Sequence, residues 1–486
     1  MNRVLFLLLC TFSTGVFSED QKNYAVVLRD QVVLRPAPRA SAKPNALLWQ
    51  GETLEVRGER LDYLQVYDYR RERGGYVRAT ELRRLSFKPE EAPELLALVR
   101  FLRDVPGSEA LGIGLAAAWF EAAPAQAVNG AAGVEALDLL GTLAERLARR
   151  ASAGKAVPAV LSAQLDVASR YGVRFVTYER EGRMALCYDG ASFRRLLAMT
   201  SSPEQRAHAA LALTDPRCMA GDLRVAERRQ LDEWRAQVLD KVDAAALPPF
   251  VRNRVLMREA GIWAGLAYQR VRQGEPAQAA AARALKALGA VDKGELADGD
   301  RTAYSEAAMR VSASRWATVA RPPEAGKRPH IVTAAGAPGE TCILLVDEKS
   351  SAEKPLAKRC TYAVVWTASA TLNREGDALA VAVQPTETWR ELWVFRKTSR
   401  AWSVRVMPPA AVNPSLGYAE FAGWVPGGAR MLVAREALGD GRHSRNFELV
   451  RLDTMTSVGQ AADPSGLAVF QRWQDPAWKR DTLALR

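Results

Sequence analysis

The spacing of apolar and polar residues divides the chain into three stretches of different character. Residues 24–84 alternate short runs of β-branched and aromatic residues with turn residues, which predicts about five short strands. Residues 89–322 are rich in Ala, Leu, Arg and Glu and place apolar side chains at helical intervals. Residues 327–486 return to strand patterns. The 486 residues therefore predict a multidomain α+β protein of about three domains.

The helical stretch shows its pattern best where Leu231, Trp234 and Val238 line one face of a charged segment. Residues 174–178 and 184–188 interrupt it with two β-type runs around a charged turn, which predicts a β-hairpin. Helices are expected near residues 90–103, 108–122, 131–150, 158–171, 191–213, 249–272, 276–288 and 302–317.

Residues 258–291 resemble a single tetratricopeptide-type helical hairpin. The small and aromatic positions of that repeat are held by Gly265, Tyr268, Ala277 and Ala284. Gly261 stands at the tryptophan position of the first helix, and no second copy follows. Because stacked repeats need about three units to be stable, we favour an ordinary helical hairpin here.

Residues 1–18 carry the pattern of a cleaved secretory signal. Arg3 supplies a positive charge, residues 4–17 form an interrupted apolar run, and Ser18 precedes two acidic residues at a plausible cleavage site. The run is shorter than the roughly twenty apolar residues of a membrane span. We expect export to the periplasm or beyond it. The alternative, a lipid anchor at Cys10, is disfavoured because leucines precede that cysteine where lipoprotein signals place a small residue.

The order of elements within residues 24–84 resembles that of the bacterial SH3-like domain. The resemblance lies in an arginine-bearing run, a Gly-Glu turn and two later runs, which are Val32-Val33-Leu34-Arg35, Gly51-Glu52, Tyr63-Leu64-Gln65-Val66 and Gly75-Tyr76-Val77. Tyr63 and Tyr76 stand where the family often has tryptophan, and residues 36–38 replace its usual Ser-Gly-Pro. The resemblance implies a small SH3-like β-barrel, commonly a targeting or peptide-binding module, often for the cell wall.

This predicted barrel supplies the candidate binding residues. They are four tyrosines, Tyr63, Tyr67, Tyr69 and Tyr76, and three arginines at an expected hairpin tip, Arg70, Arg71 and Arg73. Tyrosine rings offer apolar contact and guanidinium groups bind carboxylates, so these residues predict a shallow groove for an anionic ligand. Strand alternation places only some of the tyrosines outside. The alternative is that they form core or interdomain contacts.

The last third of the chain carries seven of its twelve tryptophans. Residues 372–381 resemble residues 424–433 at a spacing of about 52 residues, and each segment precedes a run that contains Glu-Leu. This repeat resembles propeller blades with a Pro-Asp-Gly turn. Three or four blades at best fit in about 160 residues, so a partial propeller or a sheet stack is expected, with the tryptophans available for its core.

Four of the five cysteines lie beyond the signal, in two local pairs. In an oxidising compartment this layout predicts two disulfides, Cys187–Cys218 and Cys342–Cys360. A metal site or a reactive thiol has less support, because the sequence contains no Cys-x-x-Cys and no histidine close to a cysteine.

Motifs for catalysis are sparse. The three histidines, His208, His330 and His443, lie in different stretches without metal-type spacing, and no nucleophile elbow, phosphate-binding loop or dinucleotide loop occurs. Residues 112–114 form a glycine pair inside an alanine-rich helix, which predicts close helix packing. Glu121 follows an apolar run and would suit a general acid for glycan cleavage if it were buried. The simpler interpretation is an exposed glutamate at a helix end.

Charge and export together narrow the expected function. The net charge is +12, and +11 without Arg3, which favours anionic partners, although alternating charges along the chain also serve solubility alone. We predict an exported, non-catalytic binding or scaffolding protein of the cell envelope. Its expected partner is a cell-wall peptide or glycan or an envelope protein, with no nucleic acid and no cofactor. The alternative is a cell-wall glycan hydrolase with its cleft in the helical domain.

Overall fold

The computed structural model describes residues 23–154, 157–180, 183–319, 327–399, 401–411, 416–439 and 442–479. The predicted signal, residues 1–18, lies outside them. The chain divides into two compact units, residues 1–200 and residues 201–486, which are described separately below. This division falls inside the predicted helical domain of residues 89–322, while mixed helix and strand in several sheets agree with a multidomain α+β layout.

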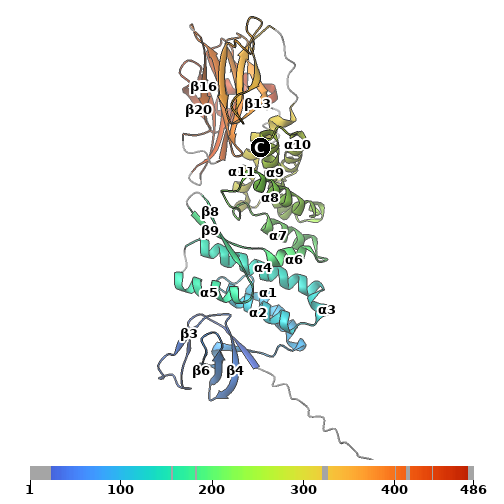
Figure 1. Cartoon of the computed structure of the whole chain (residues 1–486), viewed down its shortest axis with the longest axis vertical. Coiled ribbons are helices and arrows are strands. Elements are labelled where there is room, and N and C mark those ends of the chain that lie inside the picture. The colour runs from blue at the N-terminus through green and yellow to red at the C-terminus, as the bar shows by residue number, and fades with distance from the viewer. Residues whose placement is uncertain are drawn as a thin grey trace, which may run out of the picture. The chain divides into compact units, whose positions relative to one another are not determined.

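The first unit begins with a small module of strands (Figure 1). They are β1 (Asn23–Val27), β2 (Val32–Leu34), β3 (Ala46–Leu48), β4 (Thr53–Arg60), β5 (Tyr63–Asp68), β6 (Arg73–Arg78) and β7 (Leu82–Leu85). Five of them form an antiparallel sheet in the order β6-β5-β4-β1-β7, and β2 pairs with β3. A bridge between Arg35 and Tyr76 joins the two sheets. Within the described residues these strands do not close into the predicted barrel, because β6 and β7 are separate edges of the larger sheet.

Strand alternation explains the core of this module. Leu64, Val66 and Val77 point to one side of β5 and β6 and are almost fully buried. Leu34 and Leu48, from the two-stranded sheet, pack onto the same cluster. The smaller sheet thus covers one face of the larger one, and this two-layer packing removes the inner apolar side chains from water.

Helices follow the module in the first unit and pack against it (Figure 1). They are α1 (Ala92–Leu102), α2 (Glu109–Ala122), α3 (Ala125–Val128), α4 (Ala131–Ser152), α5 (Pro158–Arg170) and α6 (Ala191–Leu197). Their shared core includes Ile113 and Trp119 of α2 and Leu143 of α4. Val26 of β1 and Leu85 of β7 join this core, so the module and the helices share one hydrophobic core and do not form separate domains.

Glycines allow the module, α2 and α4 to approach closely. A Cβ atom on Gly51 would lie 2.4 Å from the carbonyl oxygen of Ala110, and Gly51 also has a φ of +84° that favours glycine. A Cβ atom on Gly114 would lie 2.9 Å from the carbonyl oxygen of Gly51, and one on Gly112 would lie 2.7 Å from Leu143. The prediction of close packing at residues 112–114 is therefore confirmed, and one of the two neighbours is the strand module.

The predicted β-hairpin is confirmed as β8 (Phe175–Arg180) and β9 (Arg183–Tyr188), an antiparallel pair that places Val176 opposite Cys187. The outer edge of β9 faces the end of α4. There the Ser152 hydroxyl accepts a hydrogen bond from the Leu186 N–H at 2.8 Å. Residues 181 and 182, at the turn, lie outside the described residues.

The second unit begins with helices. They are α7 (Pro203–Leu213), α8 (Val225–Asp240), α9 (Pro249–Arg272), α10 (Gln278–Gly289) and α11 (Arg301–Ser314). The segment that resembles a tetratricopeptide repeat is the hairpin of α9 and α10, with Ala277 and Ala284 buried between helices. The hydroxyl of Tyr268 donates to the carbonyl of Pro385, in the following sheet, at 3.0 Å. The helices and the sheet of this unit therefore share a polar as well as an apolar contact.

The strands of the second unit form two sheets. A three-stranded sheet contains β10 (His330–Ala335), β11 (Thr341–Val346) and β12 (Ala357–Thr361). An eight-stranded sheet contains β13 (Val364–Leu372), β14 (Ala378–Thr386), β15 (Trp389–Lys397), β16 (Trp402–Met407), β17 (Leu416–Val425), β18 (Arg430–Gly439), β19 (Arg442–Arg451) and β20 (Ser457–Ala461). The short helix α12 (Ala468–Trp473) packs on it through Phe470.

The internal repeat of about 52 residues has a structural counterpart. Strands β13 to β16 form one antiparallel meander and β17 to β20 form another, and the two similar segments lie at the β13–β14 and β17–β18 turns. A short parallel pairing of β15 with β17 joins the meanders into one sheet. A partial propeller would have separate blades, whereas the described strands form one continuous sheet. The resemblance to propeller blades therefore stays an interpretation.

Several tryptophans of the last third occupy the core, as one of the sequence interpretations proposed. Trp366, Trp389 and Trp393 are each at least 95% buried, whereas Trp402 and Trp424 are half-buried. Among the described residues, no helix combines the length and the apolar character that crossing a bilayer requires.

Candidate functional site

The outer face of strands β4, β5 and β6 gathers most of the predicted tyrosines. Because Leu64 and Val66 point into the core, Tyr63, Gln65 and Tyr67 point to the opposite side of β5. The strand register sets Gln65 opposite Tyr76 of β6. Three of the four predicted tyrosines therefore share one face of the sheet, which we call the tyrosine face; its members are Glu55, Arg57, Tyr63, Gln65, Tyr67, Tyr76 and Arg78, together with the adjoining Tyr69.

One part of the tyrosine face is a cluster around Arg57 that includes two exposed side chains, Arg57 and Tyr69. The Arg57 guanidinium lies 3.8 Å from the ring centroid of Tyr67 and 6.0 Å from that of Tyr69. The two rings meet edge to face at 5.0 Å. Glu55 accepts a hydrogen bond from Arg57 at 2.7 Å and another from the Tyr69 hydroxyl at 3.1 Å. Four side chains thus hold one another in place on an exposed surface.

The electrostatics of this cluster favour a permanent cation. The hydrogen bond that Arg57 donates to Glu55 raises the pKa of Arg57 above its usual value, and the Tyr69 hydroxyl adds to that effect. Tyr69 is 54% exposed, so its ring is available to a ligand on at least one side. Rings beside a guanidinium suit the apolar face of a sugar or an aliphatic side chain, and the cation suits a carboxylate.

The other two predicted tyrosines are less accessible. Tyr63 is 3% exposed, and the Arg78 guanidinium lies 5.9 Å from its ring centroid. Tyr76 is half-buried, and its backbone exchanges hydrogen bonds with Arg35 at 2.7 and 3.0 Å. Tyr63 is therefore a covered member of this face, in line with the alternative interpretation that some tyrosines are packing residues.

The predicted arginine cluster is arranged differently from the expectation. Arg71 pairs with buried Glu52 at 3.0 Å and also with Asp68, while Arg70 pairs with Asp166 of α5. Arg73 donates to the carbonyl of Asn45 at 3.3 Å. The β5–β6 turn is thus tied to α5 and to the core of the module. Spacing along the chain did not reveal this, because Glu52 and Asp166 are distant in sequence from the turn.

The sequence interpretation missed Arg57, Arg78 and Gln65 as members of the tyrosine face. The two-residue period of the strands could have identified Gln65 and Arg78. Gln65 lies between Tyr63 and Tyr67 on β5, and Arg78 and Tyr76 flank the buried Val77 on β6. The partner strand β4 adds Arg57 beside Tyr67. That neighbour required the β4–β5 register, which contains a bulge between Val56 and Gly58.

The other candidate residues do not form a second site of the predicted kinds. Glu121 is exposed at the end of α2, so the apolar setting that would favour a general acid is not present. His443 pairs with Glu436 at 2.7 Å, and the ring of His330 lies 3.0 Å from a backbone carbonyl oxygen. The first contact joins the neighbouring strands β18 and β19, and the second is made to Arg328, just before β10.

The cysteines of the described chain are all disulfide-bonded. The predicted bond between Cys342 and Cys360 is confirmed and links the directly paired residues of β11 and β12. Cys187 and Cys218 are also disulfide-bonded, and their pairing with each other stays a prediction. Glu340 lies within 4.8 Å of the Cys342 and Cys360 sulfurs, but sulfurs joined in a disulfide are not thiolate ligands for a metal.

Comparisons of the chain with models of protein families, with curated proteins and with solved structures give no match.

Proposed function

We propose that the protein is an exported, non-catalytic binding protein of the cell envelope, and that its SH3-like N-terminal module binds an anionic cell-wall peptide or glycan. The observation that carries this proposal is the exposed Arg57–Tyr67–Tyr69 cluster. Glu55 holds Arg57 and Tyr69, and both of these contact the Tyr67 ring, so the cluster is ordered before any ligand arrives and the ordering cost of binding is lower. Arg78 and Gln65 extend the same face with further hydrogen-bond donors.

The ligand chemistry follows from these groups. Cell-wall polymers present sugar rings with apolar faces and peptide stems with carboxylates. Tyr67 and Tyr69 suit the first, and Arg57 and Arg78 suit the second. The bonded cysteines support an oxidising compartment, and the net charge of +12 supports an anionic partner.

The experiment that tests this proposal is sedimentation of the whole mature protein with purified peptidoglycan. We expect retention that falls with added salt, because exposed charges are screened over about 8 Å at physiological ionic strength. The double variant Arg57→Ala/Tyr69→Ala should reduce retention about tenfold, since both groups lie on the exposed surface. Arg103→Ala is the matched control, because Arg103 is also an exposed arginine paired with a nearby carboxylate but lies just after α1, outside the tyrosine face.

Two results would contradict the proposal. Retention of the double variant equal to that of the control variant would remove the tyrosine face as the binding surface. Release of soluble muropeptides from the same peptidoglycan by the unaltered protein would instead point to the glycan hydrolase.

A further inference from the structure

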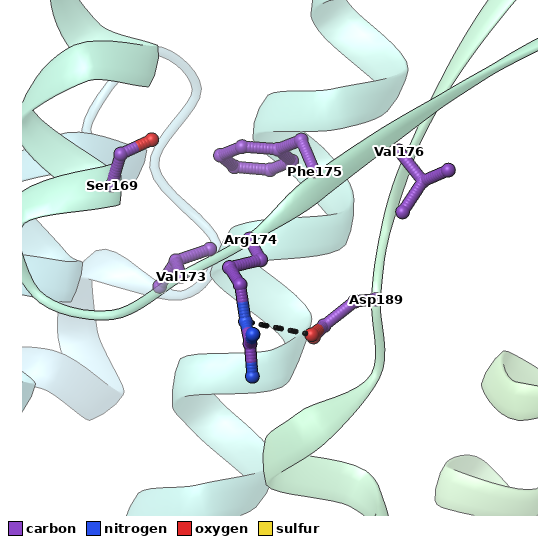
Figure 2. Close-up of a pocket in the computed structure, with 6 residues that line it drawn as sticks. All are labelled: Ser169, Val173, Arg174, Phe175, Val176 and Asp189. Atoms are coloured by element: carbon purple, nitrogen blue, oxygen red, sulfur yellow. Dashed lines mark ion pairs between the residues drawn. The ribbon is translucent and has the colours of Figure 1, made fainter.

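A concave site separate from the tyrosine face lies in the first unit at the open end of the β8–β9 hairpin. It is an open pocket of about 510 Å³ between the end of α5, the start of β8 and the residue after β9. Figure 2 shows Phe175 and Val176 on opposite sides of the strand and Arg174 extending toward Asp189. The lining residues are Ser169, Val173, Arg174, Phe175, Val176 and Asp189. The pocket therefore combines an apolar wall with one guanidinium and one carboxylate.

The strand beside this pocket has a free edge. The N–H of Asp189 donates to the carbonyl of Arg174 at 2.9 Å, so the backbone N–H and C=O groups of Arg174 and of every second residue after it point toward β9. The backbone groups of Phe175, Thr177 and Glu179 consequently point away from β9. On the far side of the hairpin, the outward groups of Leu186 are met by the Ser152 hydroxyl. Among the described residues, no strand pairs with β8 other than β9.

The charge at the pocket favours a carboxylate ligand. The Arg174 side chain is 81% exposed, and its Nε atom lies 3.5 Å from Asp189. Asp189 is further engaged by the Ala191 N–H at 2.9 Å and by Arg194 at 3.9 Å. Within the described chain, the Arg174 side chain makes no hydrogen bond besides its ion pair with Asp189. Two arginines around one aspartate leave a net positive charge at the mouth of the pocket.

We propose that the β8 edge and this pocket bind the C-terminal segment of a partner polypeptide as an added antiparallel strand. In that orientation the last residue of the peptide reaches the start of β8, where its carboxylate pairs with Arg174. Its last side chain enters the pocket against Val173 and Phe175. The backbone of the peptide bonds Thr177 and Glu179, as in other cases of strand addition. This site is separate from the tyrosine face and does not rest on the function proposed for it.

The test uses the whole mature protein and fluorescein-labelled peptides Gly-Thr-Val-Thr-Val-X, with each standard amino acid in turn as a free C-terminal residue X. Fluorescence anisotropy should show saturable binding that is strongest for apolar X. The C-terminal amides of the best peptides should bind about tenfold more weakly, because they lose the charge-assisted pairing with Arg174. Arg174→Ala should abolish this difference between acid and amide.

The backbone edge is tested at Thr177. Thr177→Pro removes an outward N–H and should weaken binding, whereas Thr177→Val keeps that N–H and should bind normally. If Thr177→Pro disturbs the fold, N-methylated peptides added to the unaltered protein test the same hydrogen bonds. Tyr67→Ala should leave peptide binding unchanged. Equal binding of acids and amides, or no saturable binding by any peptide of the series, would overturn the proposal.

Discussion

Each compact unit contains a buried glutamate that pairs with two arginines, and the two sites differ in how much water reaches the arginines. Glu52 in the first unit pairs with Arg71 and Arg170, whose side chains are 23% and 28% exposed. Glu420 in the second unit pairs with Arg315 and with Arg390, which is fully buried. One glutamate and two arginines therefore lie in a partly solvated environment in the first unit and in a solvent-excluded one in the second. We call Glu52, Arg71 and Arg170 the wet cluster, and Glu420, Arg315 and Arg390 the dry cluster.

The difference shows in the remaining hydrogen bonds of each cluster. Glu52 also accepts from the backbone N–H of Trp49, at 3.2 Å, and its arginines keep contact with solvent. Glu420 accepts from the Trp478 indole at 3.2 Å, while Arg390 donates to the carbonyl of Ser312 at 2.5 Å. Burial lowers the pKa of Arg390 to about 10. In the dry cluster each charge must be balanced by another side chain of the cluster, whereas in the wet cluster water can solvate a charge that loses its partner.

The largest expected effect follows from neutralising the dry carboxylate. Glu420→Gln keeps the shape of the side chain but leaves Arg315 and Arg390 without a compensating charge. We expect a loss of about 3–5 kcal/mol in the free energy of unfolding of the second unit. Calorimetry of the whole protein measures it, with Glu52→Gln as the matched control in the first unit. Equal losses in the two variants would contradict the role assigned to water.

A smaller effect is expected from removing the excess cation in the dry cluster. Arg390→Met leaves Glu420 paired with Arg315 alone and replaces a desolvated charge by an apolar side chain of similar length. The lost hydrogen bond to Ser312 and the lost contact with the Tyr418 ring offset that gain. We expect a net loss of about 1–2 kcal/mol, below that of Glu420→Gln in the same calorimetric measurement. A larger loss than that of Glu420→Gln would show that Arg390, rather than Glu420, organises the cluster.

These clusters also mark where prediction from sequence ends. The strands around Tyr63 and Tyr76 and the hairpin at residues 174–188 could be predicted, because alternation and turn residues are local properties. Arg71 was expected at an exposed tip for the same reason. Its actual partner, Glu52, also contacts Arg170, which is 118 residues further along the chain. Ion pairs of that kind depend on how sheets and helices pack, and no local spacing encodes them.

The same limit applies to the tyrosine face. Its tyrosines were identified from residue type and strand spacing, whereas Arg57 was missed because it joins Tyr67 across a bulged register. The pocket beside β8 was not predicted, since its lining residues come from the end of a helix, the start of a strand and the residue after another strand. Side chains that are ordinary by themselves become a site only when the fold assembles them.

The smallest expected effect concerns the wet cluster, where Glu52→Gln should cost about 1 kcal/mol or less near neutral pH. Arg71 keeps its pairing with Asp68, and both arginines remain in contact with water. Burial raises the pKa of Glu52 above its ordinary value of 4.5, so a neutral side chain is tolerated at this position.

The pH dependence of that variant sharpens the comparison. Because the pKa of Glu52 is higher in the folded than in the unfolded protein, the folded state binds its proton first as the pH falls. As the pH falls from the raised pKa of Glu52 to 4.5, the free energy of unfolding of the unaltered protein should therefore rise relative to that of Glu52→Gln. Below pH 4.5 the difference between the two proteins should be constant. Urea titrations of both proteins at a series of pH values measure this difference. A difference that shrinks as the pH falls would mean that the arginines lower the pKa of Glu52 by more than burial raises it. Pairing with arginine would then control the glutamate in both clusters, whatever its contact with water.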